Sequence, residues 1–107
     1  MIILIIGTTP TFTLTIPDKE ELDLNNAENI YFTIRQGSLK ITKSGEDIII
    51  INEYTVQVSF TQEETLQFRY NIPAEIQLNW IYANGARAAT KIKTIELSKN
   101  LIREVLE

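Results

Sequence analysis

Apolar and polar residues alternate along most of this 107-residue chain, in short segments separated by turn-forming residues. In residues 11–16, for example, Phe12, Leu14 and Ile16 alternate with threonines. Strict alternation is the pattern of a strand with one buried and one exposed face. Such segments between regular turn signals predict an all-β fold of seven to eight short antiparallel strands, and we favour a sandwich over a barrel. The length is that of a single domain, residues 1–107.

Turn residues predict how neighbouring strands pair. Residues 30–43 are expected to form a hairpin whose two-residue turn is Gln36-Gly37, which sets Ile34 opposite Leu39. After a second turn, a further strand pair is expected around the dipeptide Asn-Glu that follows the isoleucine run. The inward-facing residues of that pair's second strand are then Val56, Val58 and Phe60.

The last hairpin, residues 74–93, is predicted to have a three-residue loop, 83–85, with Gly85 in a left-handed conformation. This loop sets the following residues opposite each other: Ile76 and Ile92, Trp80 and Ala88, and Glu75 and Lys93. The apolar alternation then changes phase, which predicts a bulge near Lys93-Thr94.

Two segments have helical features. Thr61 and Glu64 match a capping box, which predicts one helical turn near 62–66. Residues 98–107 are predicted to form a short C-terminal helix with Ser98 as its N-cap, because their apolar residues recur at helical spacing. A helix of ten residues is unstable alone, so this one is expected to dock on the sandwich or on a neighbouring protein.

The apolar run at residues 2–6 is predicted to be a strand covered on both faces. It ends at Gly7, whereas a membrane-spanning helix needs about 20 apolar residues. No Lys or Arg precedes Lys19, so the positive start of a signal peptide is missing. Four of the five residues are isoleucine, whose branched side chain favours strands. We therefore expect neither a signal peptide nor a transmembrane segment.

Cysteine and histidine are both absent from the sequence. Disulfides, zinc sites built on these residues, and Ser-His or Cys-His nucleophiles are therefore excluded. The net charge of −4 is unfavourable for binding nucleic acid, which is not expected as a partner.

The carboxylates are the remaining candidates for chemistry. They cluster at three places: Asp18, Glu20, Glu21 and Asp23; Glu46 and Asp47; and Glu63 and Glu64. All fall in expected loops, turns or a helix start, where solvated charge is usual. A calcium site on residues 18–26 and a hydrolase with paired carboxylates are the alternatives, but the EF-hand pattern is absent. We predict no catalytic, metal or cofactor-binding residue, and no enzymatic activity.

Aromatic and basic residues offer two further candidate surfaces. Trp80 shares a face with the apolar residues of its strand and is expected in the core, whereas Tyr31 lies on the face opposite Phe32 and is expected to be exposed. A short basic strip on the last hairpin consists of Arg87, Lys91 and Lys93. Three charges are ordinary for a solvated face, so we assign the strip no function.

Four stretches together resemble a group of small prophage proteins of Firmicutes, especially Clostridia. These are GTTPTFTLTI, ENIYFTIRQGSLKITKSGEDI, VSFTQEETLQF and IQLNWIYANGARAATKIKTIELSKNLIREVLE. Proteins of that group are encoded among tail or baseplate genes and resemble the immunoglobulin-like N-terminal domain of phage baseplate upper proteins. The resemblance implies an immunoglobulin-like sandwich and a structural or assembly role in a phage tail or baseplate.

The implied partners are other tail or baseplate proteins, or further copies of the chain. The chain would then be a virion component, or lie in the host cytoplasm during assembly. Candidate partner-docking residues are Ile2, Ile3, Leu4, Ile5, Ile6, Leu101, Ile102, Val105 and Leu106. A carbohydrate-binding module acting at the bacterial surface is the alternative, since exposed tyrosines can stack on sugars.

Overall fold

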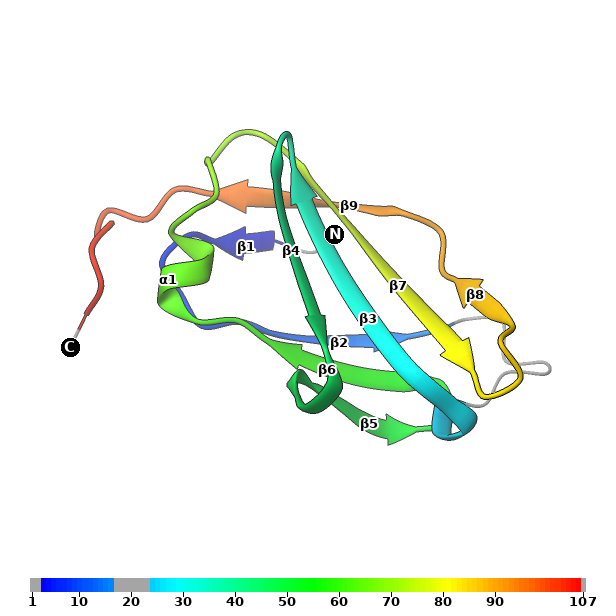
Figure 1. Cartoon of the computed structure of the whole chain (residues 1–107). Helices are drawn as coiled ribbons and strands as arrows, with labels where there is room; N and C mark the ends of the chain where they lie inside the picture. The colour runs from blue at the N-terminus through cyan, green and yellow to red at the C-terminus, as the bar shows by residue number, and fades with distance from the viewer. Residues whose placement is uncertain (1–2, 17–23, 107) are drawn as a thin grey trace.

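The computed structural model describes residues 3–16 and 24–106 (Figure 1). These residues contain nine strands, one helical turn and two 3₁₀ turns. In chain order they are β1 (Ile3–Ile5), β2 (Thr11–Thr15), η1 (Leu24–Asn26), β3 (Ala27–Gln36), β4 (Leu39–Ser44), η2 (Gly45–Asp47), β5 (Ile48–Asn52), β6 (Thr55–Ser59), α1 (Gln62–Thr65), β7 (Ala74–Tyr82), β8 (Arg87–Ala89) and β9 (Lys93–Ser98).

The strands form two sheets that pack face to face (Figure 1). The larger sheet has the order β1-β9-β7-β3-β4, with β8 also pairing with β7, and the smaller has the order β2-β6-β5. Strand β1 runs parallel to β9, and the other described pairs are antiparallel. This order matches the B-E-D and G-F-C sheets of an immunoglobulin domain, with β4 in the position of C′. The fold is an immunoglobulin-like β-sandwich, as predicted, but the described residues form nine strands instead of seven to eight, and the β1–β9 pair is parallel instead of antiparallel.

Aromatic rings hold the two sheets together. Phe12 of the smaller sheet contacts Phe32 of the larger one with 5.8 Å between ring centroids, and Phe60 lies 5.6 and 5.7 Å from these two rings. Trp80 is also buried, as predicted, and its indole nitrogen donates a hydrogen bond to the hydroxyl of Tyr82. Such pairs add to the stability that burial of their apolar area gives.

The β5–β6 pair confirms the predicted alternation. Val56, Val58 and Phe60 are buried, and the turn lies one residue later than expected, at Glu53-Tyr54. The side-chain oxygen of Asn52 accepts a hydrogen bond from the Tyr54 backbone N–H. This side-chain turn explains why the chain reverses after Asn52.

The predicted register of the β3–β4 hairpin is wrong by two residues. Ile34 lies opposite Ile41, and Gln36 lies opposite Leu39, so the turn is Gly37-Ser38. Gly37 has φ +59°, which suits the first central position of a two-residue hairpin turn. The shift keeps every apolar side chain on its expected face, because the side-chain period of a strand is two.

Burial of the Gln36 side chain explains this register. Its amide nitrogen donates to the carbonyls of Arg69 and Ile72 at 2.7 and 2.8 Å, and its amide oxygen accepts from the Arg69 N–H at 2.7 Å. The loop after α1 is therefore fixed to the end of β3. If Gln36 lay in the turn, as predicted, its side chain could not reach the Arg69 and Ile72 backbone groups, and these would lose their hydrogen-bond partner.

The last hairpin confirms part of the prediction. Trp80 lies opposite Ala88, the loop has three residues, and Gly85 has φ +88°. The pairing then shifts by one residue between β8 and β9, so Ile76 lies opposite Lys93 instead of Ile92. The irregularity precedes Lys93, because the Thr90 hydroxyl accepts a hydrogen bond from the Leu78 N–H.

The same shift overturns the expected contact between Glu75 and Lys93. Glu75 lies opposite Thr94 in the β9 register. Its carboxylate pairs instead with the Arg35 guanidinium on β3, at 2.7 Å. Arg35 and Glu75 lie directly opposite each other on neighbouring strands. Lys93 is therefore an exposed residue of β9 that does not lie opposite Glu75.

The predicted C-terminal helix is not present in residues 99–106. Ser98 is the last residue of β9, and the chain continues in bends and coil. Asn100 accepts a hydrogen bond from the Ile102 N–H at 3.0 Å, a side-chain turn that competes with a helical start. No helix in the described part of the chain is long and apolar enough to cross a membrane.

Candidate docking surfaces

Strand β1 divides the predicted docking residues of the N-terminal run into two sets. Leu4 and Ile6 are buried in the core, whereas the Ile3 and Ile5 side chains are 55% and 45% exposed. Assigning Leu4 and Ile6 to a docking surface was therefore wrong, since one face of β1 packs on its own sandwich. The other face of β1, with Ile3 and Ile5, is exposed in this chain. The prediction that both faces of this strand are covered is therefore wrong for the single chain. Ile2 lies outside the described residues.

The segment 99–106, which we call the tail, is held by polar contacts at both ends. Near its start, the Asn100 side-chain nitrogen donates to the Ile6 carbonyl at 3.0 Å. At its end, the Gln62 side chain of α1 donates to the Leu106 carbonyl and accepts from the Leu106 N–H, at 3.1 and 2.9 Å. The tail is thus positioned against β1 and α1 at one end of the sandwich (Figure 1).

The apolar side chains of the tail point outward. Leu101 is 92% exposed, and the other predicted docking residues of this segment are exposed as well: Ile102, Val105 and Leu106. Single exposed apolar residues are common on protein surfaces, but four in one short segment with fixed ends make that segment a candidate patch. The predicted docking residues of the tail are therefore all exposed, although in a segment without regular structure and not on a helix.

Basic side chains border this patch. Lys99 and Arg103 lie over the Tyr70 ring, with their charged groups 5.7 and 4.6 Å from its centroid. A hydrogen bond from Arg103, together with the positive charges of Arg103 and Lys99, lowers the pKa of the Tyr70 hydroxyl. The tail therefore combines apolar and cationic character.

A second apolar surface lies on β5 and was missed from the sequence. Ile49, Ile50 and Ile51 are all exposed, with Ile49 at 56%. Residues 48–51 are four isoleucines in succession, so they leave no polar face for solvent. Residues 2–6 are a similar uninterrupted apolar run, so the signal that predicts a docking strand there is present in β5 as well.

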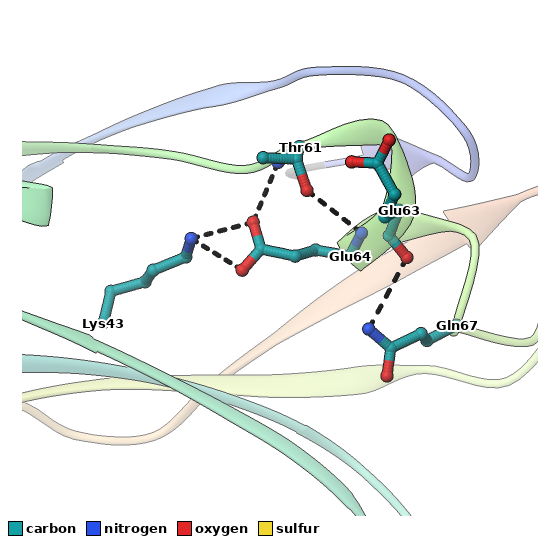
Figure 2. Close-up of polar contacts among 5 residues, drawn as sticks. All are labelled: Lys43, Thr61, Glu63, Glu64 and Gln67. Atoms are coloured by element: carbon teal, nitrogen blue, oxygen red, sulfur yellow. Dashed lines mark hydrogen bonds and ion pairs between the residues drawn. The ribbon is translucent and has the colours of Figure 1, made fainter. Parts of the chain in front are cut away.

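A polar cluster joins β4 to α1 (Figure 2). The Lys43 ammonium lies 2.8 and 2.6 Å from the two carboxylate oxygens of Glu64, which also accepts from the Thr61 N–H at 2.8 Å. The Thr61 hydroxyl accepts from the Glu64 N–H, which completes the predicted capping box. The carboxylate of Glu63 points away from this cluster (Figure 2).

The groups around the Glu64 carboxylate determine its pKa. Burial raises the pKa of Glu64, but hydrogen bonds from Lys43 and Thr61 and the charge of Lys43 outweigh burial and hold the pKa below its ordinary value of 4.5. Glu64 is therefore charged at neutral pH and fully used in hydrogen bonding. This arrangement suits a structural cap, because the carboxylate oxygens already contact their own partners.

The other carboxylate candidates do not form a described site. Asp18, Glu20, Glu21 and Asp23, with most of the 18–26 segment, lie outside the described residues. Glu46 and Asp47 are exposed in η2. Within residues 3–16 and 24–106, no group of three His, Cys, Asp or Glu side chains is arranged to hold a metal ion.

Two hollows among the described residues bear on function. The first, about 510 Å³, lies between β2 of the smaller sheet and β7 of the larger one, opens beside Ile16, and is lined by a mixture of apolar and polar residues. The second, about 300 Å³, is lined by Tyr31, Asn79 and Arg87 among others. Tyr31 is 39% exposed, as predicted, and it lies with an amide and a guanidinium at this hollow.

Comparisons with known proteins add the following. No protein-family model matches the sequence, and no curated protein matches it either. Among solved structures, murine CRIg is similar over 92% of this chain and 91% of its own chain, with 10% sequence identity and a TM-score of 0.43. The expected relationship to prophage tail proteins stays a prediction.

Proposed function

We propose that this chain is a non-catalytic structural or assembly module of a phage tail or baseplate that acts through contacts with other proteins. The single observation that supports it most is the tail, whose polar anchors fix a segment that presents four apolar side chains to solvent. Ordering such a segment in advance lowers the entropy that a partner contact must overcome. The resemblance to prophage tail and baseplate proteins supplies the biological setting.

The location proposed for the chain follows from this role. It is a component of the virion, or it lies in the host cytoplasm while the tail assembles. Its partners are then other tail or baseplate proteins. Nucleic acid is not among the proposed partners, because the net charge of −4 opposes binding to phosphates.

Mass spectrometry on tailed particles from the induced source strain tests this function. Peptides of the chain are expected at a fixed ratio to the known tail proteins, and a capsid fraction without tails should lack them. Absence of the chain from intact tailed particles would argue against a virion role. Its presence in assembly intermediates alone would make it a transient assembly factor.

A carbohydrate-binding module at the bacterial surface is the second candidate, and the Tyr31 hollow favours it. An exposed aromatic ring beside an amide and a guanidinium offers both a stacking surface and hydrogen-bond donors. A glycan array with the wild-type chain and Tyr31→Ala tests it, with Ile49→Ala, a change at another exposed residue outside this hollow, as the control. Binding that is lost only in Tyr31→Ala would support this candidate, and an array without binding would exclude it at useful affinity.

A further inference from the structure

The surface on β5 lies at the outer edge of the smaller sheet. Strand β5 pairs with β6 on one side and has no strand neighbour on the other among the described residues. Natural proteins usually protect such an edge with Lys, Pro or an inward-pointing charge. The strand Ile48–Asn52 contains none of these and exposes three isoleucines. The free edge of β5 is therefore both unprotected and apolar, which are the properties of a contact surface.

Acidic side chains surround this edge. A hollow of about 110 Å³ lies beside Ile48 and Ile50, and Glu28 is part of its lining. Glu46 and Asp47 precede the strand and Glu53 follows it, all three exposed. The two salt bridges within the described residues include none of these four carboxylates. We call this surface the acidic edge: an apolar strand with a negative rim.

The tail has the complementary character. Its most exposed residue, Leu101, lies between Lys99 and Arg103 in the sequence, and Glu104 is the one acidic residue among the described positions 99–106. Both cations are held at the surface over Tyr70. An apolar side chain flanked by positive charges matches an apolar strand flanked by negative ones.

We propose that the tail of one copy of this chain docks on the acidic edge of a second copy. This inference rests on the proposed function, because it names one partner of the docking surface assigned there. Figure 1 shows the tail beyond α1 at the left of the view, whereas β5 lies at the lower middle, on the far side of β6 from β2. Since Gln62 and Asn100 anchor the tail, a molecule cannot cover its own acidic edge. The contact is therefore between copies.

The symmetry of this contact follows from its two different halves. Pairing two acidic edges would bring like charges together, which is unfavourable. A tail-to-edge contact is heterologous, so each pair leaves one free tail and one free edge. Further copies add in the same direction, and they form a ring or an open filament depending on the rotation between neighbours.

Sedimentation velocity of the full chain, from about 1 μM to 1 mM, tests the contact with Leu101→Glu and Ile49→Glu. Both positions are exposed, so both variants should keep the fold, which circular dichroism checks. Each substitution is expected to weaken self-association at least about tenfold. Ile92→Glu is the control, because Ile92 is 53% exposed, close to the 56% of Ile49, but belongs to neither surface.

Mixing the two variants separates this contact from any symmetric one. Leu101→Glu keeps its acidic edge and Ile49→Glu keeps its tail, so an equimolar mixture should form a dimer that does not grow further. If Ile49→Glu fails to fold, the double variant Glu46→Lys with Asp47→Lys replaces it; Leu101 is 92% exposed, so Leu101→Glu needs no substitute.

Three outcomes would overturn the proposal: a wild-type chain that stays monomeric at 1 mM, a mixture no more associated than its components, or an equal loss in Ile92→Glu. A monomeric chain that is still recovered in tailed particles would overturn this contact alone. Absence from particles would affect the proposed function alone.

Discussion

Glu64 and Gln36 are polar side chains that fix loops to the sheets. Glu64 joins the cap of α1 to Lys43 on β4, so one carboxylate connects two elements that lie far apart in sequence. Gln36 bonds three backbone groups of the loop before β7. Both side chains replace hydrogen bonds that water would otherwise make, and their removal leaves polar groups without partners.

Acid should weaken the cap. Because the pKa of Glu64 is lower in the folded than in the unfolded chain, the unfolded state binds more protons. The stability that Glu64 contributes is therefore present above about pH 4.5 and is lost as the pH falls through the folded-state value. Glu64→Gln should lower the free energy of unfolding by about 1–2 kcal/mol at pH 7, and by less at pH 3. Urea unfolding at both pH values measures this.

Glu63→Gln is the matched control for this prediction. Glu63 lies in the same helical turn, but its carboxylate points away from Lys43 (Figure 2). This variant should have nearly the stability of the wild type at either pH. An equal effect of both substitutions would mean that general charge, and not the cap, sets the acid response.

Gln36 is buried, but replacing it by an apolar residue of similar size should still lower the free energy of unfolding. Gln36→Leu removes partners from the Arg69 N–H and from the carbonyls of Arg69 and Ile72. We expect a loss of about 2–3 kcal/mol in the free energy of unfolding, measured with urea. Gln57→Leu, which removes one 3.4 Å bond on an exposed surface, should cost less than about 0.5 kcal/mol. Equal losses would refute the assigned role.

Single residues differ in how far the sequence predicts them. The capping box follows from two residues three positions apart, so it could be predicted. The Lys43–Glu64 pair joins positions 21 residues apart and depends on how β4 packs over α1, which no local pattern contains. The sequence prediction places Gln36 in the turn because that register puts the apolar residues of both strands on one face, whereas the buried hydrogen bonds of Gln36 favour the strand.

The tail behaves as an element without regular secondary structure. Its order depends on Gln62 and Asn100, whose side chains bond its backbone at both ends. Few of its apolar groups are buried, so burial contributes little to holding it in place. Local opening of such segments occurs without global unfolding.

Releasing the tail should therefore be visible by proteolysis. Gln62→Ala removes both hydrogen bonds to Leu106 and should raise the rate of trypsin cleavage after Arg103 roughly fivefold. The midpoint of urea unfolding should change little. Gln67→Ala, which removes a single 3.5 Å bond within the helical turn, is the control. An unchanged cleavage rate in Gln62→Ala would show that packing, and not Gln62, orders the tail.

At the scale of elements, the strands could be predicted but the tail could not. Alternation is a local property that persists in the folded state, so Val56 and Val58 were assigned correctly. The spacing of apolar residues after Ser98 also fits a helix, but Asn100 forms a side-chain turn that the periodicity does not reveal. The break between β8 and β9 likewise depends on Thr90, whose hydroxyl bonds the neighbouring strand.

Across the whole molecule, β1 completes the core of the sandwich. Its three residues pair with the end of β9, so the first and last strands lie side by side (Figure 1). Leu4 is fully buried while Ile5 points outward. The two-sided apolar run could be recognised as a strand from sequence, but the choice of β9 as its parallel partner depends on the assembled sheet.

Substitutions on β1 should separate stability from docking. Leu4→Ala should lower the free energy of unfolding by about 2–5 kcal/mol, because it leaves a cavity in the core. Ile5→Ala should cost less than about 1 kcal/mol, because that side chain is 45% exposed. Chemical denaturation at low protein concentration measures both. Equal losses would mean that the outward face of β1 is covered in solution.

The parallel pairing of β1 and β9 also sets how the domain responds to tension. Force applied at Ile3 and at Asn100 pulls the two strands in opposite directions along their own axes. Their ladder, with the added bond from the Ile6 N–H to the Ser98 carbonyl, is then loaded in shear. All of its hydrogen bonds resist together instead of opening one at a time. A domain stretched between its neighbours would meet its strongest mechanical resistance at this pair of strands.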